Sequence, residues 1–244
     1  MKRFLILMIA AVLAACSAAE PKPSETASTG QHGCDAFVEC GSASDSEGEA
    51  SFKEKYEALN GTENASGKIH RTITIPQQHP FIESTPAEVL KRIENKESFY
   101  VYVGDPKCPW CRAVIETAIA KAEEYGVNEI LYLEIWDAEG NEILRDKYEL
   151  KDGKAVLVTE GAEGYSELLT AFDSLLDEYE LKDGDTVVDV GEKRIYAPNY
   201  FRIEQGKAIR MTTAIPDTME DPRSEISQEQ LDFMAECFDG FFGE

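Results

Sequence analysis

Two cysteines separated by two residues, Cys108 and Cys111, constrain this chain more than any other feature. They follow an apolar, strand-like run at 99–103 and precede a run with helical spacing that begins at about Arg112. The N-terminus of a helix presents unpaired backbone N–H groups and the positive end of the macrodipole, and both stabilise a thiolate. We therefore expect Cys108 to be the more acidic and more reactive thiol. Pro109 is tolerated in the first helical turn because its missing N–H is not needed there.

The Cys-x-x-Cys spacing alone fits more than one kind of chemistry. It occurs in reversible dithiols, in structural disulfides and as half of a zinc site. A zinc site of four ligands needs a second pair, and the sequence has neither another Cys-x-x-Cys nor two histidines at zinc-ligand spacing. It also has no glycine-rich phosphate loop. The motif therefore favours dithiol redox chemistry without a metal or an organic cofactor, while a structural disulfide or a partial metal site stays open.

The first fifty residues are typical of an export signal followed by a tether. Residues 1–15 begin with Lys2 and Arg3 and continue as an apolar run that is too short to span a bilayer as a helix. The small residues before Cys16 resemble a bacterial lipobox, which implies cleavage there and lipidation of the Cys16 sulfur; an ordinary signal peptide cut nearby is the alternative. Residues 16–50 contain few large apolar side chains and predict a flexible tether. We therefore expect an extracytoplasmic lipoprotein of the cell membrane, in a compartment where disulfide chemistry persists.

The charge of the chain argues against one class of partner. It carries 24 basic and 47 acidic residues, a formal net charge of −23. Nucleic acid and anionic lipid call for basic surfaces, so neither is an expected partner. We expect contact with the membrane through the lipid anchor on Cys16.

The remaining cysteines have simpler interpretations. Cys34 and Cys40 both lie in the tether, and a local loop-closing disulfide is the simpler prediction, with a second redox pair as the alternative. Cys237 lies at the edge of the apolar face of the last predicted helix, which is typical of a partly buried apolar residue.

The order of elements in residues 51–244 predicts an α/β domain. Period-two alternation at 71–75 predicts a strand, and Thr85 as N-cap, Pro86 in the first turn and Glu88 completing a capping box predict the start of a helix. The apolar run at 99–103 predicts a strand covered on both faces, and 129–135 predicts another. With the helix after the Cys pair, the order strand, helix, strand, helix, strand is typical of parallel strands with crossover helices.

The second half of the chain predicts an insertion and then a hairpin and a helix. Residues 137–193 are acidic and rich in turns, and we interpret them as an insertion with one strong helix. The helical stripe comprises Tyr165, Leu168, Leu169, Phe172, Leu175, Leu176 and Tyr179. Residues 199–211 predict a hairpin that turns at 205–207, and a capping box at 227–230 opens the last helix.

This order of elements resembles the thioredoxin fold, whose signature is a Cys-x-x-Cys motif at a strand-to-helix junction. The resemblance covers roughly residues 68–242. The stretch 102–112, Tyr-Val-Gly-Asp-Pro-Lys-Cys-Pro-Trp-Cys-Arg, is also similar to extracytoplasmic thioredoxin-like lipoproteins of Gram-positive bacteria, some of which are labelled bacteriocin transport accessory proteins. The resemblance implies a central mixed sheet flanked by helices, with 137–193 as a helical insertion.

The resemblance implies roles for individual residues. Cys108 would attack a substrate disulfide, and Cys111 would resolve the mixed disulfide. A cis-proline faces the cysteine pair in that family, and Pro198 occupies the matching place; a trans proline that starts an edge strand is the alternative. Pro198 and Ala197 would position the substrate chain by backbone pairing.

The dipeptide inside the motif would also touch the substrate. Trp110 would shield one side of the pair and, with Pro109, supply contact surface; plain packing at the start of the helix is the alternative for Trp110. Lys107 would assist the thiolate electrostatically, or would simply be solvated.

Three departures from the family pattern leave the chemistry partly open. The dipeptide is Pro-Trp where thioredoxin has Gly-Pro, and because this dipeptide tunes the redox potential, the direction of electron flow stays open. Ala197 stands where the residue before the cis-proline is often β-branched. The buried acid of the family falls on Tyr102, so Asp105 or a water is left to take the proton from Cys111.

These observations predict a membrane-tethered thiol–disulfide oxidoreductase. Its partners would be a protein disulfide or dithiol and a membrane electron donor, and whether it reduces, oxidises or isomerises stays open. The alternative is a redox-inactive accessory module for a secreted or membrane partner, in which the Cys pair is a static staple and residues 137–193 carry the interface.

Overall fold

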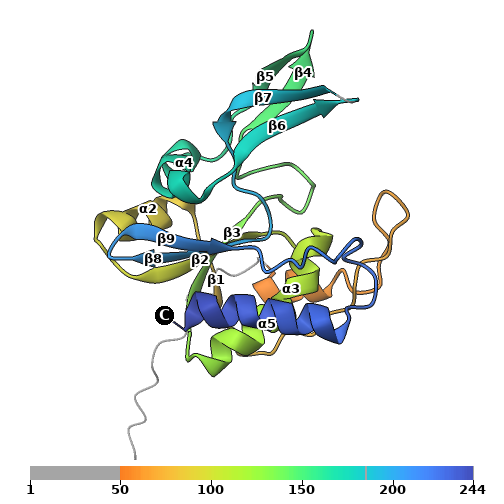
Figure 1. The fold of residues 1–244 in the computed structure, drawn as a ribbon, viewed down its shortest axis with the longest axis vertical. Helices are drawn as coiled ribbons and strands as arrows, with labels where there is room; N and C mark the ends of the chain where they lie inside the picture. Colours follow the sequence, from red (N-terminus) through yellow and green to blue (C-terminus); the bar gives the residue numbers. More distant parts are fainter. Residues whose placement is uncertain (1–49, 185, 244) are drawn as a thin grey trace, which may run out of the picture. The chain divides into compact units, whose positions relative to one another are not determined.

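The computed structural model describes residues 50–184 and 186–243, so the predicted signal, the tether and Cys16, Cys34 and Cys40 lie outside the described residues. The described part is a mixed α/β fold around a five-stranded sheet of strand order β1-β3-β2-β8-β9 (Figure 1). The strands are β1 (Phe81–Glu83), β2 (Phe99–Gly104), β3 (Ile130–Glu134), β8 (Asn199–Glu204) and β9 (Lys207–Thr212). The first three strands of this order are parallel, and β8 and β9 are antiparallel to their neighbours. The predicted mixed sheet is therefore confirmed.

Helices cover both faces of this sheet. They are α1 (Phe52–Glu57), α2 (Pro86–Glu94), α3 (Pro109–Glu124), α4 (Tyr165–Phe172) and α5 (Gln228–Phe242), with a 3₁₀ turn η1 (Asp173–Leu175) after α4. Helices α3 and α5 pack together below the sheet in Figure 1, and α2 and α4 pack together on the opposite side. Alternate residues of β2 supply the two cores, with Tyr102 in the cluster under α3 and α5 and Val101 in the cluster under α2 and α4. None of these helices is long and apolar enough to cross a membrane.

Local sequence signals set most helix ends. Thr85 accepts the Glu88 N–H at 3.3 Å with Pro86 in the first turn, as predicted for α2. The predicted capping box is only half formed, because the Glu88 side chain binds Arg92 Nε at 3.0 Å instead of the Thr85 backbone. A capping box of Ser227 and Gln230 opens α5, also as predicted. Gly126 follows α3 with φ +67°, the left-handed conformation that ends many helices.

The strand predicted at 71–75 is wrong. Ile73 and Ile75 are buried on one side as the alternation indicated, but the backbone of this segment pairs with side chains instead of with a strand. The N–H of Ile73 donates to Asn60 Oδ1 at 3.0 Å, and that of Ile75 donates to Glu57 Oε1 at 2.8 Å. The edge strand of the sheet is β1, which is only three residues long.

The helical insertion predicted at 137–193 is also wrong in its main character. The described part of this segment contains α4 and two antiparallel hairpins, which lie side by side (Figure 1). The hairpins pair β4 (Lys147–Lys151) with β5 (Lys154–Thr159) and β6 (Glu178–Asp183) with β7 (Thr186–Lys193). The helical stripe ends with η1, and Tyr179 at its predicted end lies in β6.

Two buried arginines, Arg145 and Arg194, connect the two ends of the hairpin region in 137–193 to the rest of the domain. Arg145 and Arg194 both pair with Glu142 Oε1, Arg194 at 2.8 Å. Arg145 Nη1 also donates to the Ile195 carbonyl at 3.3 Å, and Ile195 lies three residues before Pro198. The segment is therefore tied directly to the loop that leads into β8.

Candidate functional site

The Cys pair lies where the sequence placed it, between the carboxyl end of β2 and the start of α3. Cys108 is the N-cap of α3 and its sulfur accepts the backbone N–H of Cys111 at 3.3 Å, with Pro109 in the first turn. Cys108 is partly exposed, whereas Cys111 is completely buried. Both are free thiols. The geometry therefore offers one sulfur to a partner and keeps the other beneath it.

The surroundings give the two thiols different acidities. Hydrogen bonding from the Cys111 thiol lowers the pKa of Cys108, and the backbone N–H groups of Cys111 and Trp110 lower it further. Burial and the negative charge of Asp105 act in the opposite direction but do not outweigh these bonds. The pKa of Cys111 is raised well above the ordinary value, first by burial and then by the neighbouring Cys108. Cys108 is therefore the more acidic thiol of the two.

The loop before β8 meets the Cys pair from the other side. The peptide bond between Ala197 and Pro198 is cis, as the family resemblance implied. The Cys108 sulfur lies 3.7 Å from the Ala197 carbonyl oxygen. Trp110 and Ala197 are partly buried and pack against the same core as Cys111. Lys107 points elsewhere, because its Nζ donates to the Asp137 carbonyl at 2.8 Å.

Asp105 places a buried carboxyl in the loop between β2 and Cys108. It is fully buried, and its two oxygens accept the backbone N–H groups of Lys107 at 2.7 Å and Trp136 at 3.1 Å. Burial is the main reason that the pKa of Asp105 rises to about 6, and these two hydrogen bonds limit the rise. A carboxyl that titrates near neutral pH therefore lies next to the more acidic cysteine.

Buried tyrosines form the floor of the site. Tyr102 of β2 and Tyr56 of α1 are completely buried, and their hydroxyl oxygens are 2.9 Å apart. The Tyr102 ring stacks on Tyr200 with centroids 4.5 Å apart and on Tyr132 at 5.5 Å. Sequence analysis missed Tyr56 because it did not predict α1, although Ser51 three residues before Glu54 is a capping-box signal.

Gly104 makes room for the Tyr102 hydroxyl. Residues 102 and 104 of β2 point to the same face of the sheet. A Cβ atom at Gly104 would lie 2.1 Å from the Tyr102 hydroxyl oxygen, which is shorter than any real contact. Only glycine therefore fits here while Tyr102 keeps its position.

Arg112 fastens the N-terminal segment to the back of the site. It directly follows Cys111, its side chain is buried, and its hydrogen bonds in the described chain go to carbonyl and amide oxygens. One nitrogen, Nη1, donates to the Tyr56 carbonyl at 2.8 Å and to the Pro106 carbonyl at 3.1 Å. A single guanidinium thus joins α1, the loop before Cys108 and the start of α3.

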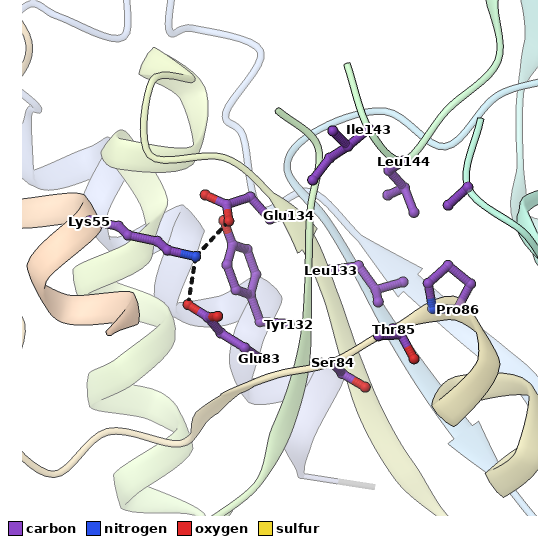
Figure 2. Close-up of a pocket in the computed structure, with 11 residues that line it drawn as sticks. Lys55, Glu83, Ser84, Thr85, Pro86, Tyr132, Leu133, Glu134, Ile143 and Leu144 are labelled. Atoms are coloured by element: carbon purple, nitrogen blue, oxygen red, sulfur yellow. Dashed lines mark hydrogen bonds and ion pairs between the residues drawn. The ribbon is translucent and has the colours of Figure 1, made fainter. Parts of the chain in front are cut away.

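A separate cavity of about 280 Å³ opens at the carboxyl ends of β1 and β3 (Figure 2). Neither cysteine of the pair lines it. At its edge Lys55 bridges Glu83 at 2.9 Å and Glu134 at 2.8 Å, while Ile143 and Leu144 form an apolar wall. Because Lys55 belongs to α1, these ion pairs hold that helix against the ends of β1 and β3.

Comparisons with known proteins give no family for this chain. No protein-family model matches it, and no curated protein matches its sequence significantly. In the described residues no three His, Cys, Asp or Glu side chains gather where they could hold a metal ion. Function is therefore inferred from the geometry of the Cys pair and its neighbours.

Proposed function

We propose that this protein is a thiol–disulfide oxidoreductase of the thioredoxin-like class that acts on protein disulfides through Cys108 and Cys111. The observation that carries the proposal is the pairing of a partly exposed thiol of lowered pKa at a helix start with a fully buried thiol of raised pKa. The attacking thiol must be accessible and ionised. The resolving thiol must be close to it but shielded from solvent until the mixed disulfide has formed. The two cysteines meet these requirements separately.

The arrangement of the sheet supports the choice of class. The order β1-β3-β2-β8-β9, with three parallel strands followed by two antiparallel ones, is the order expected of a thioredoxin-like sheet. The Cys pair follows the central strand β2, and Pro198 begins the approach to β8. Under this proposal the two hairpins of 137–193 are an insertion in that fold.

The proposed reaction proceeds in two exchange steps. The Cys108 thiolate attacks one sulfur of a substrate disulfide, forming a mixed disulfide and releasing the other substrate sulfur as a thiolate. Cys111 then attacks Cys108, which forms the Cys108–Cys111 disulfide and releases the second substrate thiol. The two electrons gained by the substrate come from the dithiol, and the reverse sequence oxidises a substrate dithiol. The backbone of Ala197, beside the Cys108 sulfur, would hold the substrate chain.

The location is proposed from the sequence. Residues 1–15 would direct export, and a lipid on Cys16 would tether the domain outside the cytoplasm. A reductase there needs electrons from a membrane donor, because it lies beyond the cytoplasmic thiol pool. No nucleic acid, metal or organic cofactor is part of the proposal.

Trapping of mixed disulfides tests the proposed activity. In full-length Cys111→Ser protein, Cys108 still attacks but nothing resolves the product, so a peptide containing one disulfide stays covalently bound. The matched variants are Cys108→Ser, which should trap no peptide, and Cys237→Ser, which should turn over like the wild type. Absence of any adduct on Cys111→Ser at peptide excess would contradict the proposal.

A second candidate, an accessory module that recognises a partner protein, has one observation in its favour. The hairpins of 137–193 expose apolar side chains at Val156, Leu157 and Val187. Large contiguous apolar patches mark protein–protein interaction sites, and under this alternative these side chains would contribute to one. In that case deletion of the insertion, not substitution of either cysteine, would abolish function.

A further inference from the structure

The two loops that meet at the Cys108 sulfur are also connected to each other through Trp136 and Arg145. The first of them, residues 105–107, leads from β2 to Cys108. Asp105 in this loop accepts the Trp136 N–H on its Oδ2 at 3.1 Å, and its carbonyl accepts the Cys108 N–H at 3.1 Å. The loop that carries the attacking cysteine is therefore bound to the backbone of Trp136.

Arg145 connects Trp136 to the second loop, which carries the cis-proline. The guanidinium carbon of Arg145 lies 5.1 Å from the centre of the Trp136 ring, a cation–π contact. Arg145 Nη1 donates to the Ile195 carbonyl at 3.3 Å. Because Ile195 is completely buried, water cannot take the place of this donor. Ala197, whose carbonyl lies 3.7 Å from the Cys108 sulfur, follows only two residues later.

The chemistry of arginine suits this bridging position. Arg145 is buried, and its Nε pairs with Glu142 Oε1, which balances its charge. A guanidinium stays charged, has a flat face that stacks on an aromatic ring, and presents its donors in a rigid fork. Arg145 can therefore satisfy the Glu142 carboxylate, the Trp136 ring and the Ile195 carbonyl at the same time. A lysine ammonium has neither the flat face nor the fork.

Arg194 shares the Glu142 oxygen, but its other side-chain contacts lie within the insertion. Its Nη2 donates to Glu142 Oε1 and its Nη1 to the Asp146 carbonyl, both at 2.8 Å. Its guanidinium carbon lies 4.3 Å from the centre of the Tyr179 ring. The side chains of Arg145 and Arg194 are 7% and 9% exposed. The two arginines are thus alike in charge, burial and carboxylate partner, and they differ in which segment they hold.

We propose that Arg145 is a positioning residue for the exchange reaction, and that it holds residues 195–198 so that the Ala197 backbone aligns an extended substrate chain beside Cys108. The inference rests on the proposed oxidoreductase function and adds a selectivity to it. A disulfide within an extended peptide should depend on Arg145, whereas a small disulfide without flanking backbone should not. Cys108 itself should react as before, because the Arg145 side chain makes none of the hydrogen bonds that join Asp105 to Trp136 and Cys108.

Two disulfides with the same leaving group test this selectivity. One is an extended peptide whose central cysteine carries thionitrobenzoate, and the other is N-acetylcysteine amide with the same group. The Cys108 thiolate attacks the cysteine sulfur of either compound, a mixed disulfide forms, and thionitrobenzoate leaves as a coloured thiolate. The reduced full-length chain is used, with its other four cysteines replaced by serine in every protein. Stopped-flow absorbance against concentration gives a rate constant for each compound.

Arg145→Met should lower the rate constant for the peptide about tenfold, the equivalent of one hydrogen bond. The loss should come from a higher half-saturating peptide concentration at an unchanged limiting rate. The rate constant for the small disulfide should remain as in the wild type. Arg145→Lys keeps the charge beside Glu142 but not the fork, so its rate constant for the peptide should fall about threefold. If Arg145→Met fails to fold, Arg145→Lys carries the test.

Arg194→Met is the matched control, because it removes the same charge from the same Glu142 oxygen. Both compounds should react with it as with the wild type. Equal peptide rate constants in Arg145→Met and the wild type, an equal loss in Arg194→Met, or an equal loss with the small disulfide would overturn the inference. A wild type that releases no thionitrobenzoate from either compound would overturn the oxidoreductase proposal itself, so the two failures are distinguishable.

Discussion

The sulfur of Cys108 lies 3.7 Å from the carbonyl oxygen of Ala197, a residue 89 positions further along the chain. Pairing of β8 with β2 creates this contact, since Asn199 at the start of β8 lies opposite Val103. The partly exposed thiol therefore faces the backbone of the loop that leads into β8, where the proposed function would place an extended substrate segment.

The Cys111 thiol should control the acidity of Cys108. It is the largest single cause of the lowered pKa, so Cys111→Ala should raise the pKa of Cys108, whereas Cys111→Ser keeps a hydroxyl donor and should raise it less. The measurement is the rate of Cys108 alkylation against pH, read by mass on the peptide that holds residue 108. Equal midpoints in wild type and Cys111→Ala would contradict this assignment.

Asp105→Asn should shift the same titration in the opposite direction. The Asp105 carboxylate raises the pKa of Cys108, so removing its charge should lower the midpoint of Cys108 alkylation. Burial raises the pKa of Asp105 to about 6, and the carboxylate carries its charge at pH values above that. Glu116→Gln, a change on the exposed side of α3, is the control and should leave the midpoint unchanged. A higher midpoint in Asp105→Asn would show that loss of hydrogen bonds outweighs loss of charge.

Asp105 should also make stability depend on pH. Its pKa is raised on folding from 3.8 to about 6, so the folded state binds the proton more tightly than the unfolded state does. The resulting stabilisation is full below about pH 4 and is lost as pH rises through about 6. From pH 7 to pH 4 the wild type should therefore gain about 2 kcal/mol in free energy of unfolding relative to Asp105→Asn. Urea unfolding of both proteins at several pH values measures this difference. A difference that stays constant with pH would contradict the raised pKa of Asp105.

Arg112→Met should destabilise the domain strongly. It leaves the carbonyls of Tyr56, Arg71 and Pro106 without their donor in a buried setting, which should lower the free energy of unfolding by about 3 kcal/mol or more. Lys182→Met, on an exposed strand, is the control and should change it by less than about 0.5 kcal/mol. Urea unfolding checks both, and equal small effects would mean that Arg112 does not anchor α1.

Gly104→Ala should lower the stability of the domain by displacing Tyr102. The new Cβ overlaps the Tyr102 hydroxyl, so the ring or the strand must move, at a cost of about 1–3 kcal/mol. Gly240→Ala is the matched control, because a Cβ there meets its nearest neighbour at an ordinary 3.6 Å. Thermal unfolding compares the two, and a Gly104→Ala protein as stable as the control would show that Tyr102 can shift freely.

The parts of the site that depend on local sequence could be predicted. The start of α3 at Cys108, the hairpin of β8 and β9, and the capping box of α5 each follow from a few neighbouring residues. The pairing of Tyr56 with Tyr102 could not be predicted in this way. It depends on α1 folding back across the sheet, held by Lys55 and by Arg112.

The two wrong predictions, the strand at 71–75 and the helical insertion at 137–193, have physical explanations. At 71–75 the alternation correctly placed the isoleucines in the core, but the side chains of Glu57, Asn60 and Glu116 satisfy the backbone that a strand would have paired. In the insertion, the helical spacing of the leucines continues past Phe172, where α4 ends. The sequence therefore predicted one long helix in place of α4, the turn η1 and the strand β6. The Asp-Gly dipeptide at 152–153 lies at the tip of the first hairpin with both residues at positive φ, a turn signal that local reading could have used.

The redox equilibrium of the Cys pair tests the central claim most directly. The full-length protein is equilibrated with a graded series of reduced and oxidised glutathione, and the thiol state of residues 108 and 111 is read by alkylation and mass. We predict a single reversible two-electron transition with a midpoint between about −270 and −120 mV, the range from thioredoxin to strong extracytoplasmic oxidants. A pair that stays in one state across the whole series would contradict the oxidoreductase assignment and favour the accessory module.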